Sequence, residues 1–270
     1  MTFLKQGTNQ DHRLVKELVE SNLHTGETTI YPREVEFIQD TREARKTDKR
    51  HKLAKIVQIL AYWPVYALLK FFFRLEIKGQ NNLIGLDGQS VIFASNHASY
   101  IDGLICAASM PRWKGEFYPK MFFPLRFLVW YRYLSIKFLF IAIYIWINGS
   151  IKIVPRGGDL KKCLSETIML LERGEKIWIY PEGKISPDGK LHQGKRGVSY
   201  LHKVTNIPVV PVGITGNFGI LSFKTLLRKN KVIVNIGRPI NSLDDSGNGS
   251  LEEGVGKVMT SIKDLIIEDA

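Results

Sequence analysis

The hydrophobic positions of this chain form two patterns that alternate from residue 151 onward. Short apolar runs are followed by stretches in which apolar residues recur every three or four positions. Short runs predict buried strands, and the three-to-four spacing predicts amphipathic helices. Strands and helices that alternate in this way indicate an α/β fold with a mostly parallel sheet.

The boundaries of the expected elements follow from the ends of these runs. Strands are expected at residues 91–94, 151–154, 176–180, 207–214 and 231–236, and helices at residues 159–173, 198–204 and 251–266. Gly174 follows the first of these helices, and glycine commonly ends a helix at that place. We predict a single α/β domain over residues 77–270, with a mixed, mostly parallel sheet flanked by helices.

A longer apolar segment precedes this domain. Residues 56–73 are apolar almost throughout, but Pro64 interrupts them and Lys70 is charged. The segment is marginal in length for crossing a bilayer, and proline inside a helix is a signal for a kink. We therefore expect residues 53–76 to form a helix or helical hairpin that lies in, or re-enters, the membrane surface. A spanning helix and a helix buried in the protein are the alternatives.

A second apolar stretch covers residues 121–147. Arg126, Arg132 and Lys137 interrupt its first half, and the uncharged run that remains at residues 138–147 is too short to cross a bilayer as a helix. We expect one long helix whose apolar face meets lipid or an acyl chain while its cations reach outward. A buried core helix with a few exposed charges is the alternative.

Composition narrows the partner and the compartment. The 270 residues include 38 basic and 26 acidic side chains, and the net charge of +12 favours an anionic partner. Residues 1–52 form a polar extension that ends in basic residues beside the apolar segment, which is typical of attachment to an anionic membrane at its cytoplasmic face. Aromatic residues cluster in apolar runs, so nucleic-acid binding is not expected. The two cysteines and the lack of a signal-peptide core indicate a reducing compartment.

The densest polar chemistry follows the expected strand at residues 91–94. Asn96 and His97 come directly after it, and Asp102 lies five positions beyond the histidine. Residues five apart do not share a helix face, so His97 and Asp102 meet only if the chain between them passes from a loop into a first helical turn. Asp102 then accepts the Nδ1 proton and leaves Nε2 free to take a proton from a hydroxyl. This indicates general-base activation of an alcohol, with a purely structural histidine–aspartate contact as the alternative.

Charged residues also follow two later strands. Arg156 lies beside two glycines, where it either binds a phosphate or remains a solvated loop residue. Glu182 precedes Gly183 and either accepts a hydrogen bond from a substrate hydroxyl or braces the loop. Lys195 lies at an expected helix start, a place that favours anions.

Other kinds of site have little support. The sequence has no G-x-S-x-G elbow, no H-E-x-x-H motif and no Cys/His metal spacing, so a serine hydrolase or a zinc enzyme is not indicated. Residues 189–196 have the G-x-x-x-x-G-K spacing of a nucleotide-binding loop, but Arg196 stands where Mg²⁺ requires Ser or Thr. We expect no metal and no bound cofactor.

Taken together, the motifs resemble the glycerolipid acyltransferase family, which includes 1-acylglycerol-3-phosphate acyltransferases. In chain order they are Asn-His-x-x-x-x-Asp at 96–102, Val-Pro-Arg at 154–156, Tyr-Pro-Glu-Gly at 180–183 and Ile-Pro-Val-Val-Pro-Val-Gly at 207–213. The resemblance implies an α/β fold and membrane association. It also implies transfer of a fatty acyl group from acyl-CoA or acyl-carrier-protein, as co-substrate, to the hydroxyl of a lysophospholipid. His97 is implied as the base and Asp102 as its orienting partner.

The resemblance also assigns the acceptor site, and there the chain departs from the family. Arg156 is implied as a phosphate contact, and Glu182 and Gly183 as acceptor-site residues. The family usually continues Glu-Gly-Thr-Arg, whereas this chain continues with Lys184 and Ile185. Isoleucine cannot bind a phosphate, but Lys184 replaces the arginine in part as a point charge.

We expect Lys184 and Lys195 to contact the phosphate of 1-acylglycerol-3-phosphate, which acylation converts to phosphatidic acid. Another lysolipid or alcohol acceptor is the alternative within the same chemistry. A non-catalytic peripheral membrane protein that binds acidic lipids is the alternative from another class.

Overall fold

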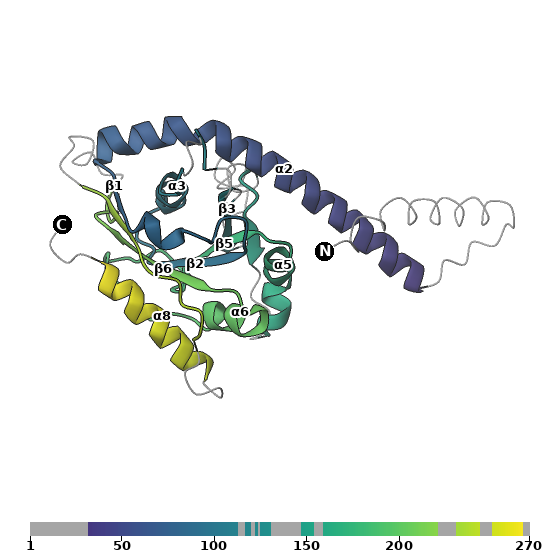
Figure 1. The fold of residues 1–270 in the computed structure, drawn as a ribbon. Coiled ribbons are helices and arrows are strands. Elements are labelled where there is room, and N and C mark those ends of the chain that lie inside the picture. Colours follow the sequence, from purple (N-terminus) through teal and green to yellow (C-terminus); the bar gives the residue numbers. More distant parts are fainter. Residues whose placement is uncertain are drawn as a thin grey trace, which may run out of the picture. The chain divides into compact units, whose positions relative to one another are not determined.

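The computed structural model describes residues 32–112, 117–119, 122–123, 125–130, 147–153, 159–220, 231–243 and 250–266 (Figure 1). The chain divides into two compact units, residues 1–49 and residues 50–270. The second unit holds the sheet and every residue discussed below, except for the start of helix α2.

Seven strands form one sheet in the order β1-β7-β6-β2-β5-β3-β4. The strands are β1 (Glu76–Lys78), β2 (Val91–Ser95), β3 (Leu125–Trp130), β4 (Ile151–Ile153), β5 (Lys176–Ile179), β6 (Val209–Thr215) and β7 (Ile233–Ile236). Neighbouring strands are parallel except β6 and β7, which are antiparallel. The predicted α/β fold with a mixed, mostly parallel sheet is confirmed.

Helices cover both faces of this sheet (Figure 1). Besides α2, the described residues form helices α3 (Asp102–Ala108), α5 (Leu160–Glu172), α6 (Gly197–Thr205) and α8 (Leu251–Leu265). Asp159 and Ser250 cap α5 and α8 by accepting a hydrogen bond from a backbone N–H in the first turn. Side chains of α2 and α3 share one buried cluster with the sheet, and those of α5, α6 and α8 share another. The core therefore has two halves with the sheet between them.

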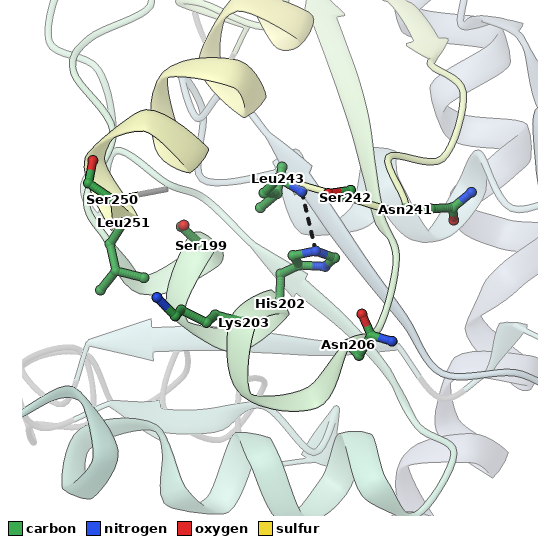
Figure 2. A pocket seen from close by; sticks show the side chains of 9 residues that line it. All are labelled: Ser199, His202, Lys203, Asn206, Asn241, Ser242, Leu243, Ser250 and Leu251. Carbon is green, nitrogen blue, oxygen red and sulfur yellow. Dashed lines mark hydrogen bonds between the residues drawn. The ribbon is translucent and has the colours of Figure 1, made fainter. Parts of the chain in front are cut away.

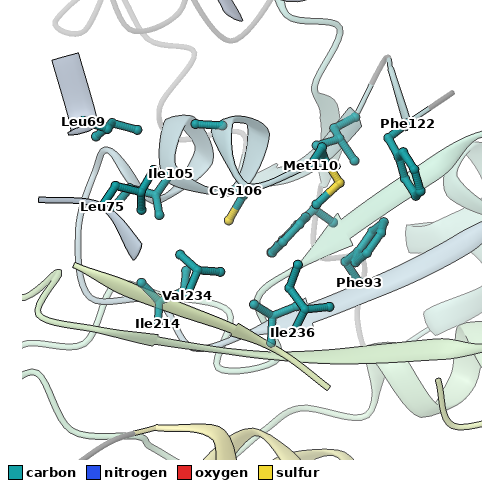
Figure 3. Packing of buried hydrophobic residues seen from close by; sticks show 14 of the residues in the cluster. Leu69, Leu75, Phe93, Ile105, Cys106, Met110, Phe122, Ile214, Val234 and Ile236 are labelled. Carbon is teal, nitrogen blue, oxygen red and sulfur yellow. The ribbon is translucent and has the colours of Figure 1, made fainter. Parts of the chain in front are cut away.

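Strand β2 lies at the centre and contributes to both halves of the core. Phe93 packs on the side of α2 and α3, with Leu69 and Ile105 in the same cluster (Figure 3). Ile92 and Ala94 belong to the cluster on the other side. Side chains that alternate between two buried faces have the period of a strand that is covered on both sides. The polar residues that follow β2 therefore emerge at the carboxyl end of a rigid central strand.

The apolar segment before the sheet is a single helix. Helix α2 runs from Pro32 to Phe73 and continues through Pro64, so the helical-hairpin alternative is wrong. The helix also begins inside the expected polar extension of residues 1–52. Its buried side chains recur about every four residues, and the gaps between them hold exposed apolar residues. The buried ones are Ala54, Gln58, Tyr62, Leu69 and Phe73, and the large exposed ones are Leu53, Ile56, Leu60, Leu68 and Phe71.

The expected helix over residues 121–147 is wrong where the structure describes this stretch, because residues 125–130 form β3. The stretch contains β-branched and aromatic residues, which favour strands. Arg126 does not reach outward: it is 2% exposed, and its guanidinium donates to the carboxylate of Glu175 and, at 2.8 Å, to the carbonyl of Gly149. A buried ion pair thus replaces the predicted outward position of this cation. Residues 131–146 lie outside the described residues.

Candidate active site

The polar residues after β2 are tied to the end of β6. The side-chain amide of Asn96 donates to the carbonyl of Ile214 and accepts from the N–H of the same residue, both at 2.8 Å. This reciprocal pair uses both hydrogen-bonding ends of the amide. Because Asn96 is buried and held in this way, the next residue, His97, leaves the sheet from a fixed position.

His97 and Asp102 are in contact at this edge of the sheet. Nδ1 of His97 lies 2.8 Å from Oδ2 of Asp102, the first residue of α3. An ionised carboxylate only accepts hydrogen bonds, so His97 donates through Nδ1–H and Nε2 carries the lone pair. The His97 side chain is 18% exposed and that of Asp102 is 0% exposed. The site therefore presents the Nε2 atom of an imidazole to the surface and fixes its ring from below, in the loop-to-helix geometry that the spacing requires.

Four donors surround the carboxylate of Asp102. Besides His97, the backbone N–H groups of Ala98 and Ser99 donate to Oδ2 at 2.9 Å each. The side-chain Nδ2 of Asn217 donates to Oδ1 at 2.8 Å. Since every partner is a donor, the surroundings of Asp102 suit a carboxylate and not a carboxylic acid.

Tyr180, directly after β5, forms one wall of the site. Its ring stacks on the imidazole of His97, with centroids 3.9 Å apart and planes within 13°. Its hydroxyl lies 3.8 Å from Sγ of Cys106 on α3. Burial raises the pKa of the Cys106 thiol well above its ordinary value. A thiol kept neutral in this way packs against the site and does not serve as a nucleophile.

Glu182 braces two loops around His97. Its Oε1 accepts the backbone N–H of His97 and its Oε2 accepts that of His192, both at 3.0 Å. Burial raises the pKa of the Glu182 carboxyl, and the two N–H bonds oppose that rise. Loop bracing is one of the two roles that the sequence allows for Glu182. Its contact with an acceptor stays a prediction.

Two lysines lie beside this brace. Gly183 has a φ of +70°, and a Cβ there would come 2.7 Å from Nζ of Lys195, so the lysine side chain lies over the glycine. The backbone N–H of Lys195 donates to the carbonyl of Pro181 at 2.8 Å. Lys184 and Lys195 are both exposed. The structure thus brings positive charge next to Glu182, whereas Arg156 lies outside the described residues.

A turn after these residues closes over the histidine loop. The N–H of Ser186 donates to the carbonyl of His97 at 2.7 Å. Asp188 organises the turn, because it accepts from the Ser186 hydroxyl, the Lys190 N–H and, at 2.8 Å, Nε2 of His192. The Lys190 N–H and then His192 contribute most to holding the pKa of Asp188 down to about 2.

Sequence reasoning missed Asn217, and it named Tyr180 only as part of a motif, with no role of its own. Asn217 follows β6 at the same edge as His97, so the rule that ligands bind beyond strand ends is a signal that points to it. The stacking of Tyr180 on His97 depends on β2 and β5 being neighbours in the sheet. No local pattern in the sequence carries that information.

A separate cavity of about 290 Å³ lies between α6, α8 and the segment at residues 241–243 (Figure 2). In it, His202 accepts from the N–H of Leu243 at 3.4 Å through Nε2 and contacts the carbonyl of Ile207 at 2.8 Å through Nδ1. The cavity lies near Ile207, just before β6, whereas His97 follows Asn96, which is bonded to Ile214 near the end of β6. The extended chain between Ile207 and Ile214 measures roughly 20 Å, so the cavity is distant from His97. Over the described parts of the chain, no three His, Cys, Asp or Glu residues form a group that could hold a metal ion.

Comparison with known proteins gives one family. The family model described as Acyltransferase matches residues 74–215, which is more than half of the chain and includes the residues around His97. A chloroplastic 1-acyl-sn-glycerol-3-phosphate acyltransferase of Brassica napus is 26% identical over 197 residues, covering 70% of this chain and 50% of that protein. The human 1-acyl-sn-glycerol-3-phosphate acyltransferase alpha is 26% identical over 158 residues, covering 58% of this chain and 50% of that protein. The chain spans about half the length of these curated relatives.

The fold also matches a solved structure. The crystal structure of PlsC from Thermotoga maritima, a 1-acyl-sn-glycerophosphate acyltransferase, aligns with a TM-score of 0.52 and 22% identity. The alignment covers 83% of this chain and 81% of that one. At this identity the likeness establishes a shared fold.

Proposed function

This chain belongs to the acyltransferase family, and from that premise we propose that it is a membrane-associated O-acyltransferase. It moves a fatty acyl group from acyl-CoA or acyl-carrier-protein to the hydroxyl of a lysophospholipid. The observation that carries the proposal is the contact of His97 with the fully buried carboxylate of Asp102.

His97 acts as a general base in this proposal. Nε2 takes the proton of the acceptor hydroxyl while its oxygen attacks the carbonyl carbon of the thioester. The C–S bond then breaks, the ester is formed, and the leaving thiolate takes the proton back from the imidazolium. Asp102 stabilises that imidazolium and keeps the lone pair on Nε2. The imidazole meets the geometric requirement, since among the described residues no side chain or backbone group bonds Nε2.

The preferred acceptor is 1-acylglycerol-3-phosphate, which gives phosphatidic acid. The named activity of the relatives favours it, and so does the charge at the site mouth. Lys184 and Lys195 flank Gly183 and supply two ammonium groups for the phosphate, as point charges instead of a bidentate arginine. Arg156 stays a proposed third contact.

Helix α2 supports attachment to the membrane surface. Residues 51–73 are long and apolar enough to cross a membrane, with a mean hydropathy of 1.6 and 22% of the apolar window buried. One side of the helix packs on the core, while Ile56, Leu60 and Phe71 are more than half exposed. This part of the helix is apolar on both faces, but only one face packs against the protein. The other face is suited to contact with lipid. We propose that the apolar part of α2, residues 53–73, lies in the cytoplasmic face of an anionic membrane.

Transfer is tested directly with the purified chain in detergent. Oleoyl-CoA and oleoyl-acyl-carrier-protein are supplied in separate reactions with an equimolar mixture of lysophosphatidic acid, lysophosphatidylcholine and lysophosphatidylethanolamine. We expect phosphatidic acid in the lipid mass spectrum and one free thiol for each ester formed. Acylation of another lysolipid only would overturn the acceptor, and no thiol release with either donor would overturn the enzyme.

Attachment is tested by flotation with phosphatidylcholine vesicles, with and without phosphatidylglycerol. We expect the chain to float with the anionic vesicles and Leu60→Glu to weaken that binding. Val204→Glu is the matched control, because Val204 is also an exposed apolar helix residue, on α6, and lies 46% exposed. Equal loss of binding in both variants would contradict the role of α2.

A further inference from the structure

The geometry points to Asn217 as a positioning residue for the base, and we propose that it fixes the carboxylate of Asp102 from the side opposite His97. This inference rests on the proposed function, because it assigns Asn217 a part in making His97 a base. Neither His97 nor the acceptor is touched by Asn217; its effect passes through Asp102.

The two oxygens of Asp102 are held in different ways. Oδ2 accepts from His97 and from the N–H groups of Ala98 and Ser99, all within the same short segment. Oδ1 accepts from Asn217, which lies 115 positions further along the chain. The side chain of Asp102 is 0% exposed, so bulk water cannot replace that donor. Among the described residues, Asn217 is therefore the only one that donates a hydrogen bond to Oδ1.

The backbone before Asn217 is shaped to deliver it. Strand β6 ends at Thr215, and Gly216 follows with a φ of +77°. A Cβ at residue 216 would lie 2.0 Å from the carbonyl oxygen of Lys231, so only glycine fits this turn. After the turn Asn217 is 3% exposed and its amide reaches Asp102 at 2.8 Å. The placement of the donor is thus built into the close approach of two backbone segments.

The neighbouring residue connects this donor to the acceptor side of the site. Phe218 lies against Gly189, where a Cβ would come 2.6 Å from its ring. Gly189 belongs to the turn that contains Asp188 and that also holds the carbonyl of His97 through Ser186. Asn217 and Phe218 therefore join the end of β6 to both loops that surround His97.

Fixing Oδ1 determines how the carboxylate faces the imidazole. With Asn217 in place, rotation of the carboxylate about its bond to Cβ would break the bond to Oδ1 and the bonds to Oδ2 together. Without Asn217 the carboxylate is held on one side only, and His97 loses part of its preference for carrying the proton on Nδ1. Since the reaction needs the lone pair on Nε2, the loss appears in turnover more than in substrate binding.

The test compares Asn217→Leu, a near-isosteric change that removes the donor, with Asn217→Ala, which leaves room for a water molecule. Asn82→Leu is the matched control, because Nδ2 of Asn82 donates at 2.8 Å to the carbonyl of Ile236 on β7, which β6 separates from β2 in the sheet. Three quantities are measured for each full-length variant: kcat, KM for the acceptor, and the ¹⁵N spectrum of histidine-labelled protein, in which His97 is assigned by its loss in His97→Ala. Circular dichroism and thermal unfolding show that each variant is folded.

We expect kcat to fall about tenfold in Asn217→Leu and less in Asn217→Ala, with KM changed by less than about twofold. The His97 signals should change from a single tautomer protonated at Nδ1 to a mixture, while Asn82→Leu leaves both readings unchanged. A folded Asn217→Leu with the wild-type tautomer and kcat overturns the inference. The spectrum needs no turnover. If the wild-type chain is inactive and Asn217→Leu still changes the tautomer of His97, the proposed function is contradicted and the role of Asn217 stands. If Asn217→Leu does not fold, the Asn217→Ala spectrum decides.

Discussion

Two histidine–aspartate pairs lie within one site and have the same distance between the ring nitrogen and the carboxylate oxygen. His97 contacts Asp102 at 2.8 Å, and His192 contacts Asp188 at 2.8 Å. In the first pair the carboxylate is completely buried, whereas the side chains of His192 and Asp188 are 37% and 47% exposed. A distance alone therefore does not mark a reactive histidine.

The partners of each carboxylate explain the difference. Asp102 is held by donors from two distant parts of the chain, and its histidine faces the surface at the end of a central strand. Asp188 is held by donors of its own turn, Ser186 and Lys190, and stabilises the fold of that turn. The inner pair is the one that the proposed function uses as a base, and the outer pair shapes the neighbouring turn.

The largest expected effect separates the two histidines. His97→Ala should lower kcat roughly 10²- to 10⁴-fold, because a general base contributes about that much to the rate. His192→Ala removes an exposed contact but keeps the backbone N–H that Glu182 accepts, so kcat should change no more than about twofold. Steady-state rates of thiol release measure both. A similar loss in the two variants would remove the distinction between the pairs.

The aspartates should differ in the same direction with a smaller effect. All four partners of Asp102 donate hydrogen bonds, so in Asp102→Asn the side-chain NH₂ faces other donors on one side. His97 is then free to carry its proton on Nε2, where it cannot accept the proton of a hydroxyl. We expect kcat to fall roughly 10²-fold with the acceptor KM nearly unchanged. Asp188→Asn serves as the control and should keep kcat within about twofold. Equal kcat values for the two variants would contradict the role of Asp102.

The smallest effect concerns the outer pair and acid stability. The folded pKa of Asp188, about 2, lies below its ordinary value of 3.8. A depressed pKa stabilises the fold above the ordinary value, and that contribution is lost as the pH falls from about 4 toward 2. Between pH 5 and pH 3 the thermal midpoint of the wild type should fall more than that of Asp188→Asn, by at most about 2 °C, because solvent screens this exposed carboxylate. Parallel curves for the two proteins would show that Asp188 adds no acid-sensitive stability.

Local signals account for the parts of the fold that the sequence predicts. The cap at Asp159, the stop at Gly174 and the apolar period between them define α5 within one residue at each end. The spacing of His97 and Asp102 likewise predicts their contact, because the bond forms within one loop and one helical turn. These features need no knowledge of what lies on the neighbouring strand.

The parts that the sequence does not reveal depend on distant partners. Arg126 looks like an interruption of an apolar segment until Glu175, 49 positions away, is placed beside it in the sheet. Asn217 is 115 positions from Asp102, and its neighbour at position 216 must be glycine because the backbone of Lys231 passes close by. In each case the polar side chain is explained by tertiary contact and not by a local period.

Helix α2 is subject to two different rules of substitution. On its inner side Gln58 accepts from the N–H of Leu125 and donates to the carbonyl of the same residue, so both shape and polarity are prescribed there. On its outer side Leu60 is 67% exposed, so exchange for another apolar residue of different shape disturbs little packing. Substitutions along this part of the helix are therefore expected to vary with a period of about four residues. The inner face should keep the same residue types, and the outer face should keep only its apolar character.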